Sequence, residues 1–409
     1  MLRALLIAGV LARAAAAQNE EAHTREAEQS VIALVTIGPG PHLNQRFGHT
    51  ALLVANRATG QRELYDYGNF VSSRATWRNV LSGRPLAFAY AQDARAEFRR
   101  LATAGRSVEL QWLALGTAGK LELLRALARD LRHSTREYLY DYRVNNCTTK
   151  IRDLIDRAAD GALRRAGQKT DSLTFRERAR RDAVLGVVAD FVAELGNAEV
   201  DRPVTMWDAA ANRTALATLV DHTQLKSTPF VDSSSVSVPE SSPWTSARAP
   251  STRRMLAAGC ACALVLVALA LFSGRLAVVT VAAASGSAGL ALGAAGMLLA
   301  IALLGGYSFA ESNVNFLLVN PLTFVAGVAG LFATFELRAF RLARRLWHFL
   351  ATLAVIAVAL ATCSLTTQVN TRVAALAAPM ILGCAAAIEI VHRIRLHRFV
   401  QKNVHLLDP

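Results

Sequence analysis

The chain has 409 residues, of which 53% are hydrophobic, and it carries a formal net charge of +14. This length accommodates two domains, or one domain and a membrane-embedded part. The charge does not indicate nucleic-acid binding, because zinc-finger spacing, an aromatic–basic sheet motif and a basic arm are all absent from the sequence. Arginines outside the cytoplasm and in membrane loops more simply indicate anionic lipid headgroups. A GC-rich genome is an equal explanation of the arginine- and alanine-rich composition.

Residues 1–17 have the pattern of a secretory signal peptide. Arg3 precedes a short apolar core and small residues precede Gln18, so we expect cleavage near Ala17. Arg13 near the end of the core is atypical, and a retained amphipathic anchor is the alternative. The signal peptide places the following domain outside the cytoplasm.

Residues 18–223 predict an α+β domain of several antiparallel strands and a few helices. Runs rich in β-branched or alternating residues, separated by glycine and proline, predict strands at 31–37, 50–55, 63–67, 86–90 and 107–113. Apolar residues at spacings of three and four predict helices at 119–133, 147–158, 171–195 and about 206–220. Residues 224–253 are rich in Ser, Thr and Pro, and we expect them to form a linker.

Long apolar runs predict a transmembrane domain of about five helices over 254–392. The runs lie at about 255–272, 277–305, 314–333, 348–364 and 373–391. Five spans place the arginine-rich segment 338–345 and the tail 393–409 in the cytoplasm, as the positive-inside rule requires. Arg253 and Arg254 lie on the opposite side and count against this topology, and six spans are the alternative.

Cys147 differs from the other four cysteines, because those four lie inside apolar runs. Asn146 is a suitable N-cap, which puts Cys147 in the first turn of a helix, where the helix dipole favours a thiolate. The commoner use of a free cysteine is as a small buried residue. In an oxidising compartment, however, an unpaired thiol is a liability unless it is used or hidden.

A thiolate nucleophile needs a base within hydrogen-bonding reach and a third group that orients the base. His49 starts a strand directly after a glycine, a position from which an imidazole can face a helix N-terminus. Asp66 on the next strand is the candidate orienting group, with a solvent-facing hairpin residue as an equal alternative. The backbone N–H of Cys147 and the amides of Asn145 or Asn146 are candidate oxyanion donors.

Metal and cofactor chemistry are not expected. The exported part has no HxxEH motif, no cysteine pair and no cluster of His and carboxylates at ligand spacing. It also has no glycine-rich phosphate loop before a helix and no GxSxG motif.

Several motifs resemble a known family. FGHT at 47–50, YDYGNF at 65–70, YDY at 140–142 and NNCTT at 145–149 are similar to the periplasmic domain of the Lnb-type lipoprotein N-acyltransferases. DRPVT at 201–205 and NFLLVNPL at 315–322 also look like signatures of this family, so the resemblance runs from about 30 to 370. The order His then Cys is similar to the permuted papain-like fold of lecithin–retinol acyltransferase relatives.

This resemblance implies an acyltransferase in the bacterial inner membrane, multi-pass, with its catalytic domain in the periplasm. A membrane phospholipid would donate an acyl chain to Cys147 as a thioester. The α-amino group of a diacylglyceryl-cysteine lipoprotein would then accept it. His49 and Asp66 would complete the catalytic group, with Asn145, Asn146 and Tyr67 in supporting positions.

Two alternatives remain open. The same Cys–His pair serves a thiol peptidase, an amidase or a lipid hydrolase, in which water replaces the amine as the final acceptor. A membrane-tethered binding module that is not an enzyme would have a structural Cys147, buried and out of reach of His49. The sequence does not determine the oligomeric state.

Overall fold

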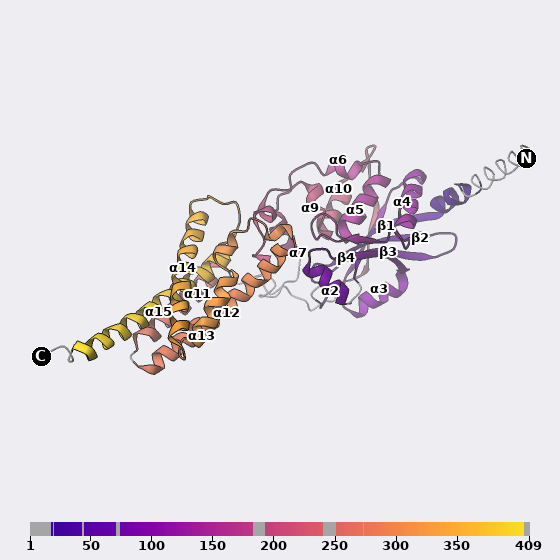
Figure 1. Ribbon diagram of the computed structural model, residues 1–409. Coiled ribbons are helices and arrows are strands. Elements are labelled where there is room, and N and C mark those ends of the chain that lie inside the picture. Colours follow the sequence, from indigo (N-terminus) through magenta and orange to yellow (C-terminus); the bar gives the residue numbers. More distant parts are fainter. Residues whose placement is uncertain are drawn as a thin grey trace, which may run out of the picture. The chain divides into compact units, whose positions relative to one another are not determined.

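The computed structural model describes residues 18, 20–42, 45–70, 74–182, 193–239, 251–272 and 274–404. The chain forms two compact units (Figure 1). The first consists of Met1–Val80, Arg84–Val184 and Pro203–Ser246, and the second of Leu81–Gly83, Leu185–Arg202 and Ala247–Pro409. The predicted signal peptide lies outside the described residues.

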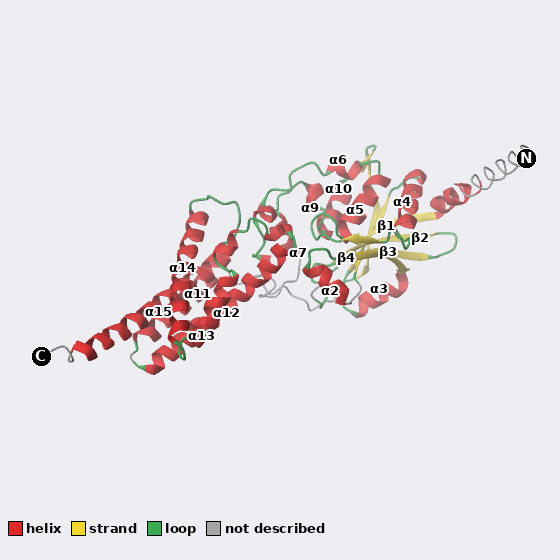
Figure 2. Cartoon of the chain, in the orientation of Figure 1, coloured by secondary structure: helices red, strands yellow, loops and turns green. Residues whose placement is uncertain are grey.

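Within the described residues, the first unit is built on a seven-stranded sheet in the order β6-β4-β3-β2-β1-β5-β9, with every pair antiparallel (Figure 2). The strands are β1 (Ser30–Ile37), β2 (His49–Asn56), β3 (Arg62–Asn69), β4 (Leu86–Asp93), β5 (Val108–Leu113), β6 (Glu137–Leu139) and β9 (Val231–Val238). The five predicted strands are confirmed as β1 to β5. The edge strands β6 and β9 were not predicted, and the α+β class is confirmed.

Helices cover both faces of this sheet (Figure 2). Ile32 and Leu34 of β1 belong to one core, which is shared with helices α4 (Thr117–Asp130), α5 (Cys147–Ala158) and α10 (Arg213–His222). Ala33 and Val35 belong to the opposite core, shared with α3 (Ala94–Thr103). Burial on both faces explains why residues 31–35 of β1 are all apolar. The remaining helices of the first unit are α2 (Arg74–Leu81), α6 (Ala162–Ala166), α7 (Phe175–Asp182) and α9 (Met206–Ala209).

Two predicted helices differ from the structure. The helix expected at 171–195 begins as α7, and its apolar positions from Val184 to Val192 lie outside the described residues. The helix expected at 206–220 is divided into α9 and α10. The division has a local cause, because the Asn212 side chain accepts from the Thr214 N–H at 2.9 Å and starts a new helix.

The linker expected to begin at residue 224 is wrong for its first part. Residues 224–238 form a hairpin of β7 (Gln224–Leu225) and β8 (Thr228–Pro229), followed by β9, which pairs with β5. The serine-rich sequence of β9 suits an edge strand, whose exposed face needs no apolar side chains. Phe230, fully buried, holds this strand to the core. Residues 240–250 lie outside the described part of the chain.

Within the described residues, the second unit contains five helical segments that are long and apolar enough to cross a membrane. They are Thr252–Leu271 (α11), Arg275–Leu304 (α12), Val314–Phe332 (η4 and α13), Leu337–Thr362 (α14) and Thr371–His397 in α15. Three short 3-10 helices in the described residues are η2 (Ala198–Asp201), η3 (Ser308–Ala310) and η4 (Val314–Leu317). Helix α13 spans Pro321–Phe332, and α15 spans Thr371–Val404. The arginines at 338–345 therefore lie in the first turns of α14 rather than in a loop, and α15 continues into the predicted tail.

Glycines allow α12 and α13 to pack closely. A Cβ atom added at Gly289 would lie 2.6 Å from the Cα atom of Gly327, so the backbones touch at this point. Small residues at helix contacts are the usual means of close packing inside membranes.

Candidate functional site

The N-terminus of α5 is shaped by a capping box. The Asn146 side chain accepts from the Thr149 N–H at 2.8 Å, and the Thr149 hydroxyl accepts from the Asn146 N–H at 2.8 Å. Cys147 is the first residue of the helix, where backbone N–H groups have no intrahelical acceptor and the helix dipole is positive. The local sequence alone therefore places the sulfur where a thiolate is stabilised.

Strand pairing brings His49 and Asp66 together. Ala51 of β2 lies opposite Asp66 of β3, so Asp66 is diagonal to His49 on the same face of the sheet. The His49 Nε2 and Asp66 Oδ1 atoms are 2.5 Å apart, and Tyr90 donates its hydroxyl to Asp66 Oδ2 at 3.1 Å. Both carboxylate oxygens are engaged, so Asp66 holds the ring in one orientation and leaves Nδ1 for another partner.

The second partner of His49 is Cys147. Burial lowers the pKa of His49, but the charges of Asp66 and Cys147, with hydrogen bonds to both, raise it well above 6.5. Burial raises the pKa of the Cys147 thiol, but the charge of His49 and a hydrogen bond with it bring that pKa below its usual value. An imidazolium–thiolate pair is therefore favoured, which is the reactive state of a cysteine nucleophile.

Two threonines that adjoin this pair link the sheet to α5. Thr50 follows His49 and Thr148 follows Cys147, and their hydroxyl oxygens are 3.0 Å apart in a buried position. Gly68 has a φ of +84°, and a Cβ atom there would lie 3.4 Å from the Cβ atom of Cys147. The hydrogen bond and the missing side chain together define how closely α5 approaches β2 and β3.

A cavity of about 430 Å³ opens beside Cys147 and His49. Phe47 and Phe70 line it and remain 49% and 40% exposed, so one part of its wall is apolar and reachable from solvent. Another part carries positive charge from Arg100, Arg106 and Arg213. The cavity therefore suits a molecule that has both an apolar chain and an anionic group.

The three side chains predicted to support the site, Asn145, Asn146 and Tyr67, form hydrogen bonds to backbone carbonyls or to Asp130. The Asn145 amide donates to the Leu139 carbonyl at 2.6 Å. The Asn146 amide donates to the carbonyls of Tyr142 and Ala211 at 2.7 and 3.0 Å. Tyr67 donates to Asp130 Oδ2 at 2.7 Å, from within the core shared with α5.

Asn146 donates both of its amide N–H groups to backbone carbonyls and Asn145 donates one, so the role of either side chain as an oxyanion donor stays a prediction. Tyr67 links β3 to α4 through Asp130 and also lies beside the Tyr138 ring. The backbone N–H of Cys147 is the other donor of the predicted set. The sequence reasoning missed Tyr90, Gly68 and the pair of threonines. The motifs FGHT, YDYGNF and NNCTT contain Thr50, Gly68 and Thr148, so a signal was present for all but Tyr90.

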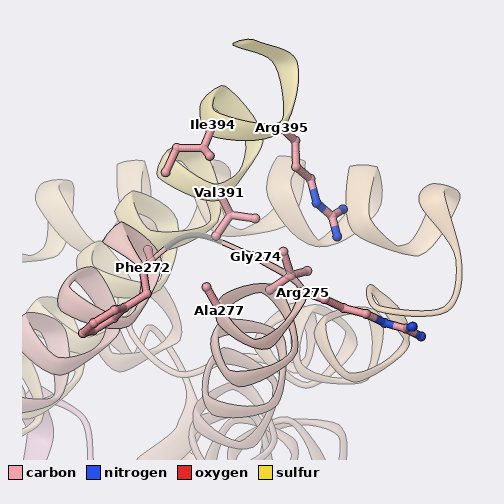
Figure 3. Close-up of a pocket in the computed structure, with 9 residues that line it drawn as sticks. Phe272, Gly274, Arg275, Ala277, Val391, Ile394 and Arg395 are labelled. Carbon is pink, nitrogen blue, oxygen red and sulfur yellow. The ribbon is translucent and has the colours of Figure 1, made fainter. Parts of the chain in front are cut away.

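The membrane unit has a smaller pocket of about 250 Å³ (Figure 3). Phe272, Arg275, Val391 and Arg395 are among its lining residues, which include no Cys, His, Asp or Glu in the described part of the chain. Nor do the described residues of the whole chain contain a group of three or more His, Cys, Asp or Glu side chains placed to hold a metal ion. The cavity beside Cys147 is therefore the candidate active site.

Comparison with known proteins agrees with the motifs. Residues 18–180 match the family model described as the Lnb N-terminal periplasmic domain, and this stretch contains Cys147, His49 and Asp66. No curated protein and no solved structure matches the chain. Residues 18–180 are thus similar to the Lnb N-terminal periplasmic domain, and the five candidate spans among the described residues indicate that the chain is a membrane protein.

Proposed function

We propose that this protein is a membrane-anchored thiol acyltransferase. It moves an acyl chain from a phospholipid, through a thioester on Cys147, to the α-amino group of a diacylglyceryl-cysteine lipoprotein. The observation that carries the proposal is the Cys147–His49–Asp66 group at the wall of a partly apolar cavity. The match of residues 18–180 to the Lnb N-terminal periplasmic domain supports the resemblance that implies this donor and acceptor.

In the first half-reaction, the Cys147 thiolate attacks the ester carbonyl of the phospholipid. The negative charge that forms on the carbonyl oxygen is near the first turn of α5, where the Cys147 N–H can donate to it. When the ester C–O bond breaks, the alkoxide of the lysophospholipid takes its proton from His49. The products are an acyl thioester, a neutral imidazole and a lysophospholipid.

In the second half-reaction, the neutral amine of the acceptor attacks the thioester carbonyl. His49 takes a proton from the amine while the C–S bond breaks, which restores the imidazolium–thiolate pair. Asp66 keeps its hydrogen bond to Nε2 throughout and stabilises the imidazolium. A thioester is more open to an amine than an ester is, so dividing the reaction at Cys147 lowers the barrier of each step.

We also infer the permuted papain-like arrangement for the first unit and the bacterial inner membrane as its location. The support for the fold is the order of the parts, with His49 at the start of a strand and Cys147 at the start of a later helix packed on that sheet. The support for the location is the periplasmic domain in one chain with five candidate spans.

Intact-mass measurement tests the proposal. Full-length protein in nanodiscs that contain phospholipid should gain the mass of one acyl chain, and the Cys147→Ala variant should not. A diacylated lipopeptide with a free α-amino group should then remove the adduct and appear as a triacylated product. Loss of the adduct to water alone, with no triacylated product, would instead identify a lipid hydrolase. Absence of any adduct in the wild-type protein would reject covalent catalysis by Cys147.

A further inference from the structure

Three guanidinium groups from separate elements converge on the cavity beside Cys147. Arg100 lies on α3, Arg106 precedes β5, and Arg213 is the first residue of α10. Electrostatic repulsion from Arg100 and Arg213, after burial as the largest cause, lowers the pKa of Arg106 to about 10. The charged form of Arg106 is therefore disfavoured by burial and by its two neighbours, and an anion bound beside it would offset both effects.

Arg106 is the buried member of this group. Its side chain is only 5% exposed, and its Nε atom donates to the Gly38 carbonyl at 2.9 Å. The Nη2 atom of Arg106 has no acceptor among the residues that the structure describes. A buried charged donor without an acceptor is costly, so an anionic ligand that accepts a hydrogen bond from Nη2 would bind favourably here.

Two carboxylates that line the cavity, Glu97 and Asp66, raise the pKa of Arg106, but other side chains hold both of them. Glu97 accepts from Arg100 Nε at 2.7 Å and from Arg100 Nη2 at 2.5 Å. Asp66 is engaged by His49 and Tyr90. Within the described lining residues, neither carboxylate forms an ion pair with Arg106, so the wall keeps a positive charge for an incoming anion.

The positive charge and the apolar wall lie in one cavity, so the ligand should carry an anionic group close to an apolar chain. Phe47 and Phe70 provide exposed aromatic surface in the same cavity, next to the reactive pair. A phospholipid has an anionic phosphodiester a few bonds from its ester carbonyls, whereas the diacylglyceryl group of the acceptor has none. A cationic subsite would therefore bind the donor and not the acceptor.

We propose that Arg106, flanked by Arg100 and Arg213, binds the phosphodiester of the donor phospholipid and aligns its ester with Cys147. This subsite rests on the proposed acyltransferase function for its role in catalysis, but lipid binding can be measured without acyl transfer. A planar guanidinium suits the purpose because it can donate two parallel hydrogen bonds to a phosphate.

The test is a binding measurement on the full-length Cys147→Ala protein in a non-ionic detergent, in which no thioester can form and no bilayer phospholipid competes. Dihexanoylphosphatidylglycerol should bind roughly tenfold or more tightly than dihexanoylglycerol, because hydrogen bonds to a charged group are the strong ones. Arg106→Gln in this background should abolish the difference. Arg99→Gln, an exposed arginine on the same helix as Arg100, should leave it unchanged.

Equal binding of the two lipids, or a difference that survives Arg106→Gln, would overturn the subsite. Inorganic phosphate that competes as well as the phospholipid does would identify a free-phosphate site and would also overturn it. If Arg106→Gln fails to fold, Arg100→Gln takes its place, since that side chain is 59% exposed.

A kinetic measurement separates this proposal from the proposed function. In the otherwise wild-type protein, Arg106→Gln should slow thioester formation from phospholipid by about tenfold or more. Transfer from a preformed thioester to the lipopeptide should stay unchanged. Lipid binding that depends on Arg106, in a protein that never forms an adduct, would reject the acyltransferase and keep the subsite. Slowing of both half-reactions alike would reject the subsite.

Discussion

Cys147 and Cys384 are the same residue type in the two units of one chain, and their surroundings differ in every respect that matters for reactivity. Cys147 starts a helix beside an imidazole and a cavity. Cys384 lies in the middle of α15, fully buried in the apolar core of the membrane unit. The comparison teaches that a nucleophile is made by a charged partner, a helix terminus and an open approach, not by the sulfur itself.

Buried polar side chains show the same contrast. In the membrane unit, the Asn313 amide donates to the Leu195 carbonyl at 2.5 Å and the Asn315 amide donates to the Glu194 carbonyl at 3.0 Å. Gln368 donates to the Gly196 carbonyl at 3.2 Å. These amides satisfy irregular backbone between helices, whereas His49 and Asp66 bond to other ionisable side chains beside a cavity. Buried polar groups indicate chemistry only in the second arrangement.

The largest change in the rate of thioester formation is expected when His49 is removed. Within the described residues, Cys147 has this imidazole partner and Cys384 does not. His49→Ala should slow thioester formation on Cys147 by about 10²–10⁴-fold, the usual contribution of a general acid–base group. Intact-mass kinetics measure this rate. His222→Ala, an exposed histidine in the same unit, is the control and should have no effect. A rate within threefold of the wild type would show that Cys147 reacts without His49.

The next effect concerns the charge that holds His49 in its protonated form. Asp66 raises the pKa of His49, so Asp66→Asn should lower this pKa and move the alkaline limb of the pH–rate profile to lower pH. The acid limb reports protonation of the thiolate, whose pKa lies below its usual value.

Asp130→Asn is the matched control for this profile, because Asp130 also accepts from a tyrosine hydroxyl but lies away from the site. An alkaline limb that does not move in Asp66→Asn would contradict the orienting role of Asp66.

The difference in alkylation rate between Cys147 and Cys384 should be smaller than the effect of His49→Ala, but still measurable. At neutral pH, iodoacetamide should alkylate Cys147 about tenfold or more faster than Cys384, because Cys147 has a greater thiolate fraction and is accessible. Peptide mass spectrometry after brief labelling gives both rates from one sample. His49→Ala should slow labelling of Cys147 alone. Similar rates at the two sites in the folded protein would contradict the environment described for Cys147.

The smallest change in rate is expected when the hydrogen bond between Thr50 and Thr148 is removed. Cys384 has no comparable pair of threonines beside it in the described part of the chain. Thr148→Val should reduce the rate of thioester formation by roughly fivefold, because a neutral hydrogen bond is worth about 1 kcal/mol. It also leaves the Thr50 hydroxyl buried without its partner. The double variant Thr50→Val/Thr148→Val should regain stability against unfolding but not activity. Full activity in Thr148→Val would show that the hydrogen bond between Thr50 and Thr148 does not contribute to catalysis.

The sequence by itself determined the features that depend on neighbours along the chain. The cap at Asn146 follows from a short polar side chain before a helical pattern, so the start of α5 at Cys147 was predictable. The strands β1 to β5 and the five membrane-length helices follow from the period and length of apolar runs. These signals need no knowledge of which segments lie together in space.

Only the tertiary structure decided the features that depend on distant segments. The register that places Ala51 opposite Asp66 settles which carboxylate reaches His49, and pairing with β5 turns a serine-rich stretch into β9. The amide of Asn146 is consumed by the Ala211 carbonyl, 65 residues away along the chain. Arg106 meets Arg100 and Arg213 only because three elements end at one cavity. Packing determines which side chains contact one another, and a local sequence pattern does not identify contacts between distant segments.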